Sequence, residues 1–302
     1  MTKLRTNHSK NSGGSAIVRV GLFAAVLSAL ILFFNRYIDN NSTSKEYKTD
    51  RISKIDVSKF NFIPNSTTNE VIFNPYFALS YSEEHEQAEW VAYELTAERL
   101  NMPWVSRSDA FLPDPQVRRE SASSYDYKDS GYDRGHLVPA ADMAFSEDAM
   151  QYTFLMSNIS PQSGNFNKGI WRELEELTRN WAKDDKALYV VTGPVLSETP
   201  KGAIGENQVS IPTAYFKVLL DYQEPQKKGI AFIIPNEVSY EPLFKYAVSI
   251  DEVEKQTGLD FFSKLISKNE EAELEGKFNI DLWTFSKTKF DLRTRKWNQE
   301  QE

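Results

Sequence analysis

The three histidines of the chain limit the imidazole chemistry that is available to it. His8 precedes an apolar N-terminal run, which leaves His85 and His136 for a catalytic or metal site. A metal centre of three histidines is therefore excluded. The absence of cysteine also excludes disulfides, thiolate metal sites and a cysteine nucleophile. An unperturbed histidine titrates near neutral pH, so a well-placed imidazole can take a proton from water.

Glycines and an arginine surround His136 in the segment SGYDRGHL, residues 130–137. Glycine permits tight backbone turns, which can bring Arg134 and His136 close together. The guanidinium group carries a permanent charge and its donors match phosphate oxygens. These residues indicate a general base beside a phosphate contact, although a histidine held in a turn beside a surface arginine accounts for them equally well. We interpret His85 as a structural or surface residue.

A second group of polar residues follows in residues 157–179. If a helix begins near Asn167, four residues at four-residue steps share one of its faces: Asn167, Trp171, Glu175 and Arg179. An amide oxygen and a carboxylate suit a hard cation such as Mg²⁺ better than zinc, because Mg²⁺ keeps several waters and takes few protein ligands. Trp171 is more typical of packing than of base stacking. A solvated Glu175–Arg179 helix pair is the simpler alternative.

The blocks DRGHLVPAADM, TFLMSNISPQ and FNKGIWRELE, in this order, closely resemble the DNA/RNA non-specific endonucleases, the DRGH family that includes mitochondrial endonuclease G. The resemblance extends over about residues 90–262. It implies an α+β fold with a ββα-metal (His-Me finger) core, set within a mixed, largely antiparallel sheet flanked by helices. In that core the ββ portion supplies the histidine and the helix supplies a metal-binding asparagine.

The resemblance implies a role for each matching side chain. His136 matches the general base that activates the attacking water. Asn167 matches the direct ligand of a single Mg²⁺, for which Mn²⁺ can substitute, and Glu175 matches the carboxylate that holds the waters around the ion. Three arginines match phosphate-contacting positions: Arg107, Arg134 and Arg179. Of these, Arg134 also counts among the catalytic residues. Asn158 and Gln162 match amides that support the site.

The implied activity is endonucleolytic hydrolysis of phosphodiester bonds in DNA and RNA, which leaves 5′-phosphate ends. Contacts to the backbone alone give little sequence preference. Family members are often dimers, so a homodimer is one candidate state, although the residues leave the oligomeric state open. The formal net charge of -8 argues against a protein that coats nucleic acid by charge alone. A nuclease that grips one phosphate through a cation and a few arginines does not need a basic surface.

Two other functions compete with this interpretation. A membrane-tethered, non-catalytic nucleic-acid-binding protein, for example in DNA uptake, has no reason to keep His136, Asn167 and Glu175 together. A phosphodiesterase for a small or lipid substrate would need an apolar substrate pocket, for which the sequence shows no evident motif. The nuclease is therefore favoured, whereas its biological purpose (scavenging, defence or uptake) does not follow from the residues.

The N-terminal segment predicts attachment to a membrane. Residues 1–15 are polar and basic, and residues 16–34 approach the length of a membrane helix, interrupted by Arg19. Positive charge before the apolar run predicts that the N-terminus stays in the cytoplasm. We therefore interpret residues 16–34 as a transmembrane signal anchor, with the catalytic domain on the periplasmic or extracellular side of a bacterial inner membrane.

A cleaved signal peptide followed by secretion is the alternative for this run. Such a peptide has a shorter apolar core and a cleavage site with small residues. Here the run ends at FFNR, residues 33–36, which offers no such site. A buried core helix is disfavoured by the polar flanks, and a mitochondrial transit peptide by the absence of an arginine-rich amphipathic pattern.

Beyond the anchor, composition divides the chain into three parts. Residues 35–69 are rich in Asn, Ser, Thr and Lys and are typical of a polar linker. Residues 70–268 are expected to form one endonuclease domain, followed by a charged tail over residues 269–302. Residues 89–100 suit a helix or a strand, and Ser249 is expected to begin a helix. A helix at 168–183 is expected together with strands at 76–81, 188–192, 214–222 and 229–234, a mixture typical of α+β folds.

Overall fold

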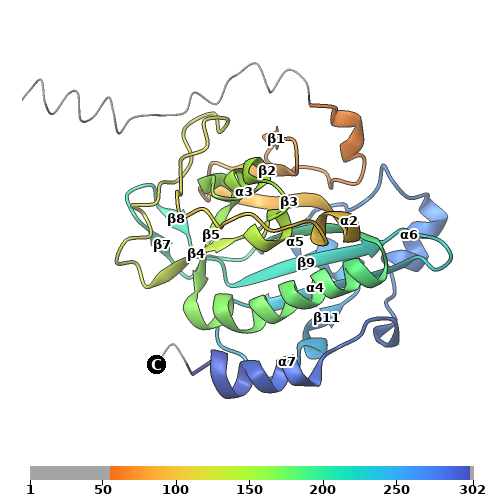
Figure 1. Cartoon of the computed structure of the whole chain (residues 1–302). Coiled ribbons are helices and arrows are strands. Elements are labelled where there is room, and N and C mark those ends of the chain that lie inside the picture. Colours follow the sequence, from red (N-terminus) through yellow and green to blue (C-terminus); the bar gives the residue numbers. More distant parts are fainter. Residues whose placement is uncertain (1–54, 300–302) are drawn as a thin grey trace, which may run out of the picture. The chain divides into compact units, whose positions relative to one another are not determined.

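A seven-stranded antiparallel sheet lies at the centre of the structure, a computed structural model that describes residues 55–299 (Figure 1). The order of its strands is β1-β2-β3-β6-β9-β10-β11. The expected α+β fold with a largely antiparallel sheet is thereby confirmed. The strands span the following residues: β1 (Val71–Phe73), β2 (Ala78–Ser82), β3 (Gln87–Thr96), β6 (Ala187–Pro194), β9 (Ala214–Asp221), β10 (Lys228–Pro235) and β11 (Ala247–Val248).

The predicted signal anchor, residues 16–34, lies outside the described residues, as does most of the predicted linker. Across residues 55–299, no helix combines the length and apolar character that a membrane span requires. The last part of the predicted linker, however, is folded. The 3₁₀ helix η2 (Val57–Phe60) is followed by Phe62, and both phenylalanines belong to the hydrophobic core. The ordered domain therefore begins before residue 70, because these aromatic rings cover one face of the sheet.

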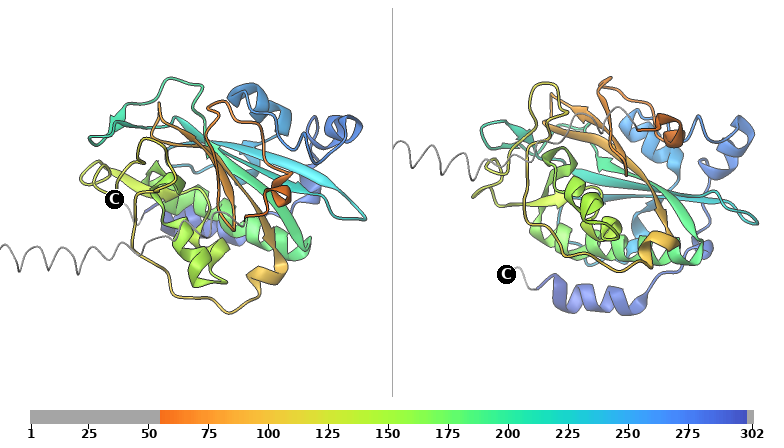
Figure 2. Two further views of the ribbon diagram at one scale, coloured as in Figure 1. Left: turned by 90° about the horizontal axis from the view of Figure 1, so that it is seen from above. Right: turned by 45° about the horizontal axis from the view of Figure 1, so that its top comes forward.

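Helices cover both faces of the sheet, since side chains alternate along each strand. Phe216 of β9 belongs to a core cluster that also contains residues of α5 (Ile250–Thr257). The next side chain back, Tyr215, faces the other way, and its ring centroid lies 5.7 Å from that of Trp171. Trp171 directly precedes α4 (Arg172–Asp184). Helices α4 and α5 therefore lie on opposite faces of the sheet (Figure 2).

Residues 89–100, which suited a helix or a strand, form both. β3 runs through Thr96, whose hydroxyl accepts from the backbone N–H of Arg99 and caps the short helix α2 (Ala97–Leu100). The first part of this segment forms a strand because Trp90 and Tyr93, on opposite faces of β3, are both fully buried beneath the helical layers. A central strand that is covered on both faces does not alternate polar and apolar residues, so its sequence does not identify it as a strand.

A second, two-stranded sheet carries the DRGH segment. Strands β4 (Tyr132–His136) and β5 (Ile159–Ser163) pair antiparallel, with His136 opposite Ile159. The chain then enters η5 (Phe166–Trp171), a π-helical turn that leads into α4. This strand, strand and helix arrangement agrees with the expected ββα core. The connection between the strands contains η3 (Ala140–Met143), α3 (Glu147–Thr153) and η4 (Met156–Asn158), and β7 (Ala203–Ile204) pairs with β8 (Val209–Ser210) elsewhere.

The helix predicted over 168–183 is present, but its first turn is irregular. Gly169 has non-helical backbone angles, φ −100° and ψ −111°. A Cβ atom at Gly169 would lie 2.8 Å from Oδ1 of Asn298, so the C-terminal segment packs directly against this turn. The kink breaks the regular four-residue spacing between Asn167 and Trp171 that the sequence predicts.

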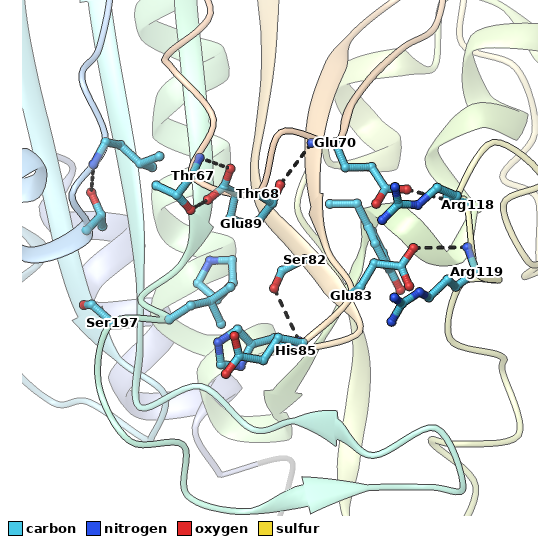
Figure 3. Close-up of a pocket in the computed structure, with 16 residues that line it drawn as sticks. Thr67, Thr68, Glu70, Ser82, Glu83, His85, Glu89, Arg118, Arg119 and Ser197 are labelled. Carbon is cyan, nitrogen blue, oxygen red and sulfur yellow. Dashed lines mark hydrogen bonds between the residues drawn. The ribbon is translucent and has the colours of Figure 1, made fainter.

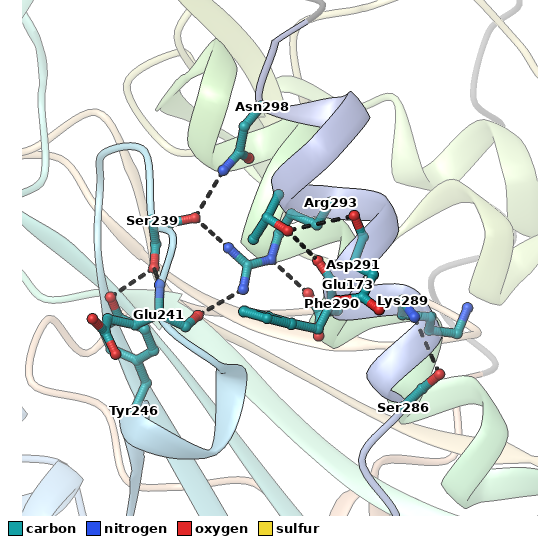
Figure 4. Close-up of polar contacts among 11 residues, drawn as sticks. Glu173, Ser239, Glu241, Tyr246, Ser286, Lys289, Phe290, Asp291, Arg293 and Asn298 are labelled. Atoms are coloured by element: carbon teal, nitrogen blue, oxygen red, sulfur yellow. Dashed lines mark hydrogen bonds and ion pairs between the residues drawn. The ribbon is translucent and has the colours of Figure 1, made fainter.

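The predicted charged tail, residues 269–302, is folded through residue 299. Arg293 is fully buried, and its Nε lies 2.5 Å from Oε2 of Glu173 on α4. The guanidinium also donates to the backbone carbonyls of Ser239 and Glu241 (Figure 4). The buried carboxylate neutralises this arginine, a fact that composition alone does not reveal. The segment contains α6 (Lys268–Leu274), η7 (Ile280–Leu282), α7 (Lys287–Leu292) and η8 (Arg293–Trp297).

Candidate active site

His136 ends β4 inside an aromatic niche. Its ring packs edge-on against Phe154 at 4.8 Å and at an angle against Phe111 at 5.7 Å. The residue is 9% exposed, and its Nε2 is buried without a hydrogen-bond partner among the described residues. Burial, helped by the positive charge of Arg107, lowers the pKa of His136 to about 3. The imidazole is therefore neutral at physiological pH and able to accept a proton.

Two buried amides hold the backbone around His136. Asn158 accepts from the N–H of Val138 at 2.9 Å and donates to the carbonyls of Val138 and Thr153. This fixes the chain directly after β4. Gln162 packs against Gly135 from β5, so closely that a Cβ on Gly135 would lie 2.2 Å from Cδ of Gln162. Both residues expected to support the site are therefore next to the histidine strand.

Asn167 lies in the π-helical turn η5 and is held by a neighbouring carboxylate. Its Nδ2 donates to Oδ2 of Asp133 at 3.0 Å. Asp133 also pairs with Lys168 at 3.2 Å. Because the amide nitrogen is engaged in this bond, the orientation of the side chain leaves Oδ1 as the available oxygen. Fixing a ligand through its second polar atom is a common feature of metal sites.

Glu175 lies on the first turns of α4, in a setting dominated by charge. Burial raises its pKa to about 7, although the positive charges of Arg179 and Lys217 oppose the shift. Arg179 forms an ion pair with Asp142 of η3 at 2.8 Å, and Asp142 also accepts from the hydroxyl of Tyr93 at 2.7 Å. The acid at 142 thus fixes the arginine beside Glu175. The Glu175–Arg179 pair is therefore not a solvated surface pair.

Lys217 comes from the sheet beneath this cluster. It is fully buried on β9, and its Nζ has no hydrogen-bond partner among the described residues. The ammonium group lies 4.9 Å from the centre of the Trp171 ring. Burial lowers the pKa of Lys217 to about 8, against the opposing effects of Glu175 and Asp142. Trp171 itself is fully buried, which agrees with packing and not with base stacking.

The two remaining arginines lie over the aromatic rings that enclose His136. The guanidinium carbon of Arg134 is 4.7 Å from the centre of the Phe111 ring, and that of Arg107 is 5.0 Å from Phe154. Both arginines are exposed, so a dissolved phosphate can reach them. The positive charge of Arg107 contributes to lowering the pKa of both His136 and Glu175.

The oxygens offered here fit a hard divalent cation. Asn167 offers an amide oxygen, and Glu175 a carboxylate that is engaged in no ion pair of the described chain. Neither a thiolate nor a second imidazole is at hand, since the chain has no cysteine and His85 lies elsewhere. Few protein ligands, all oxygen, are what Mg²⁺ accepts while it keeps its waters. The residues present therefore fit the expected metal.

Sequence reasoning missed three polar residues of this cluster: Asp133 as the partner of Asn167, Asp142 as the partner of Arg179, and Lys217. The first two lie inside the DRGHLVPAADM block, but nothing in the block indicates their partners. Lys217 interrupts an apolar strand, FKVLL. A lysine at a position whose neighbours are all buried is the one signal that could have drawn attention to it.

His85 belongs to a different part of the surface. It lines a pocket of about 490 Å³ together with Glu83, Arg118 and Arg119, and this pocket includes neither His136, Asn167 nor Glu175 (Figure 3). Its Nδ1 lies 3.0 Å from the hydroxyl of Ser210. This contact agrees with a structural role for His85.

Comparisons with known proteins identify the family. The profile described as DNA/RNA non-specific endonuclease matches residues 59–268. The chain is 36% identical over 215 residues to Nuclease C1 of Cunninghamella echinulata var. echinulata, which covers 66% of this chain and 85% of that protein. It is 37% identical over 223 residues to mitochondrial endonuclease G of Caenorhabditis elegans, covering 68% and 72%. A chain in a crystal structure of the EndoG/EndoGI complex superposes with a TM-score of 0.62 at 30% identity, covering 69% of this chain and 91% of that one. The protein therefore belongs to the DNA/RNA non-specific endonuclease family and is a nuclease that hydrolyses phosphodiester bonds.

Proposed function

We propose that this nuclease cleaves both DNA and RNA internally, with one Mg²⁺ and with His136 as the general base, and leaves 5′-phosphate ends. The observation that carries the proposal is the buried imidazole of His136, which is neutral because burial lowers its pKa and whose Nε2 has no hydrogen-bond partner among the described residues. A protein that only binds nucleic acid does not need a neutral, buried imidazole whose ring nitrogen can accept a proton.

Endonuclease G-like nucleases depend on a divalent metal. In this chain, Asn167 would hold the ion directly through Oδ1, and Glu175 would hold its outer shell. When bound, Mg²⁺ stabilises negative charge on the phosphate and on the departing oxygen as a Lewis acid. Mn²⁺ also prefers oxygen ligands and can occupy the same donors.

His136 takes the proton of the attacking water at its free imidazole nitrogen. The water oxygen forms a bond to phosphorus while the bond from phosphorus to the 3′-oxygen breaks. The 3′-oxygen takes up a proton from solvent as it leaves, and the phosphate stays on the 5′-oxygen. Substrate phosphates bring negative charge next to the niche, and this raises the pKa of His136 from its low value in the free protein. A positioned base of this kind contributes about 10²–10⁴-fold to the rate.

The three arginines act on the phosphate itself. Arg134 and Arg107 lie over the aromatic rings that enclose His136, and Arg179 is held by its ion pair with Asp142. Their fixed charges stabilise the non-bridging oxygens as charge develops in the transition state. All these groups address the backbone and not the bases, which supports cleavage with little sequence preference.

The membrane anchor over residues 16–34, the location of the domain outside the cytoplasm and the homodimer all stay predictions. Fractionation of cells that express the full chain, with and without residues 16–34, tests the first two. Sedimentation of the purified chain tests the third.

The decisive experiment incubates the full chain with supercoiled plasmid and with RNA, in Mg²⁺ or in EDTA. We expect degradation of both substrates in Mg²⁺ alone. His136→Ala should lose at least about 100-fold in rate while it still binds DNA. His85→Ala is the matched control, because it removes the other histidine of the domain and should retain activity. Near-normal cleavage by His136→Ala would disprove the assigned base. Failure of the unmodified chain to cut either substrate with any divalent metal would favour the non-catalytic binding protein.

A further inference from the structure

Three carboxylates converge on the side of the sheet that faces away from α4. Asp251 lies in the first turn of α5, Glu254 one turn later, and Glu275 directly follows α6. One oxygen from each of the three lies within 4.8 Å of the others. The backbone fixes this meeting, because the N–H of Asp251 donates to the carbonyl of Glu275 at 3.1 Å.

Glu275 is the unusual member of the group. Its side chain is fully buried, and neither Oε1 nor Oε2 has a hydrogen-bond partner among the described residues. Buried carboxylates are normally paired, hydrogen-bonded or bound to a metal, because desolvation without compensation is costly. Both oxygens of Glu275 therefore lack this compensation among the described residues, and one of them faces the other two carboxylates.

Basic side chains do not supply that partner. The charges that act most strongly on Glu275 are all negative and come from four residues: Glu254, Glu271, Asp251 and Asp260. Lys255, the lysine of α5, pairs with Glu252 instead, at 3.6 Å. Acidic residues of α5, of α6 and of the loop between them thus surround Glu275, and no basic side chain of the described residues pairs with it to offset their charge.

The cluster is also shaped like a cation site. Glu254 is held in place because its Oε1 accepts from the backbone N–H of Phe261 at 2.8 Å. Its Oε2 takes no part in that bond. A Cβ atom on Gly276 would lie 2.8 Å from the carbonyl of Ala272 and 3.3 Å from Oδ2 of Asp251. Only glycine at this position lets a backbone carbonyl and a carboxylate border the same space.

We infer that Asp251, Glu254 and Glu275 bind a divalent cation, preferably Ca²⁺, which ties α5 to α6. Ca²⁺ takes about 6–8 oxygen ligands at about 2.3–2.6 Å in flexible geometry, so its ligands can stand nearly 5 Å apart. Asp251 is exposed, which gives the ion access to solvent and leaves room for waters. On binding, the ion would take the place of the proton on the buried Glu275 and offset the charge of the carboxylate.

This site is separate from the nuclease centre. Helices α5 and α6 contact β10 on one face of the sheet, whereas α4, with Glu175, covers the other (Figures 1 and 2). The expected effect of Ca²⁺ is therefore stabilisation of the domain and not participation in cleavage.

The test is thermal unfolding of the full chain in EDTA and in millimolar Ca²⁺, in an Asn167→Ala background that disables the nucleolytic metal site. At a Ca²⁺ concentration of about 100 times Kd, the Tm should rise by roughly 5–10 °C. Calorimetric titration with Ca²⁺ should show one site. In the same background, Glu275→Gln and Asp251→Asn should each abolish the Tm rise and weaken binding at least about tenfold.

Glu273→Gln is the matched control, because Glu273 lies on the same helix and is exposed outside the cluster. This variant should keep the Ca²⁺ response. Asp251→Asn changes an exposed residue, so it remains informative even if Glu275→Gln alters folding. The inference is wrong if the parent chain binds no Ca²⁺ at millimolar concentration. It is also wrong if Glu275→Gln and Asp251→Asn both respond to Ca²⁺ as fully as Glu273→Gln does.

Discussion

Gly135 and Gln162 approach each other across the β4–β5 pair so closely that no side chain fits between them. A Cβ on Gly135 would lie 2.2 Å from Cδ and 2.3 Å from Oε1 of Gln162. Gln162 is fully buried, so it has little freedom to retreat. The glycine of the DRGH segment is thus required by the glutamine of β5, and their contact sets the position of His136.

Gly135→Ala is expected to reduce cleavage by more than about tenfold, because the new methyl group must push β4 and the adjacent His136 away from their positions. Small displacements of catalytic groups are costly to the rate. Plasmid cleavage at saturating Mg²⁺ measures the effect, and circular dichroism checks that the fold persists. Gln162→Ala, combined with Gly135→Ala, should restore part of the loss by making room. Wild-type activity in Gly135→Ala alone would contradict the steric argument.

Lys217→Met should lower activity at pH 7 by about tenfold or more and shift the rising limb of the pH–rate profile upward. The positive charge of Lys217 lowers the pKa of Glu175, which burial has raised to about 7. Without that charge, Glu175 ionises only at higher pH. Methionine fills a similar volume, and replacing a buried ammonium group that has no hydrogen-bond partner among the described residues is expected to keep or raise stability. A profile that falls in parallel at every pH would indicate a steric role for the lysine instead.

The stability of the metal-free protein should fall as the pH rises from about 5 to 9. Burial raises the pKa of Glu275 to about 9, whereas an unfolded chain releases this proton near the ordinary glutamate value of 4.5. Between these values the folded state binds more protons than the unfolded state, so stability present at low pH is lost as the pH increases. Urea denaturation in EDTA measures it, with a slope of at most about 1.4 kcal/mol per pH unit. Glu275→Gln should flatten this dependence, and an unchanged slope in that variant would contradict it.

Arg293→Ala should destabilise the domain by about 3–5 kcal/mol, because it leaves the buried carboxylate of Glu173 without its partner. Guanidinium chloride denaturation measures the change. Arg295→Ala is the control, since Arg295 is exposed two residues farther along the same segment. Replacing both members of the pair, with Glu173→Gln and Arg293→Met, should recover much of the loss. Equal stabilities of the two alanine variants would show that the ion pair is dispensable.

Local patterns were enough to predict the elements that carry the site. His136 and Arg134 lie two residues apart on one strand, and Glu175 and Arg179 lie one turn apart on α4, so the proximity within each pair follows from secondary structure alone. The strands at 188–192, 214–222 and 229–234 were also predicted, because β-branched and aromatic runs between turn residues are informative. These elements appear as β6, β9 and β10.

The remaining features depend on tertiary contacts. Lys217 becomes part of the site only because β9 passes under Trp171, and no pattern near residue 217 gives its neighbours. The C-terminal segment was predicted as a tail from its charge, but Arg293 is neutralised by an acid 120 positions earlier. The kink at Gly169 has the same origin, since Asn298 packs against it.

We expect that last contact to form late during folding. The β4–β5 pair and the helix after it are close in sequence and can form early, whereas the Glu173–Arg293 pair closes a loop of 120 positions, which is slower. The turn that carries Asn167 is braced only when this late segment docks beside Gly169. A newly collapsed chain can thus possess its full sheet and still lack an organised catalytic centre. During refolding, the circular dichroism signal of the sheet should return first and the nuclease activity second.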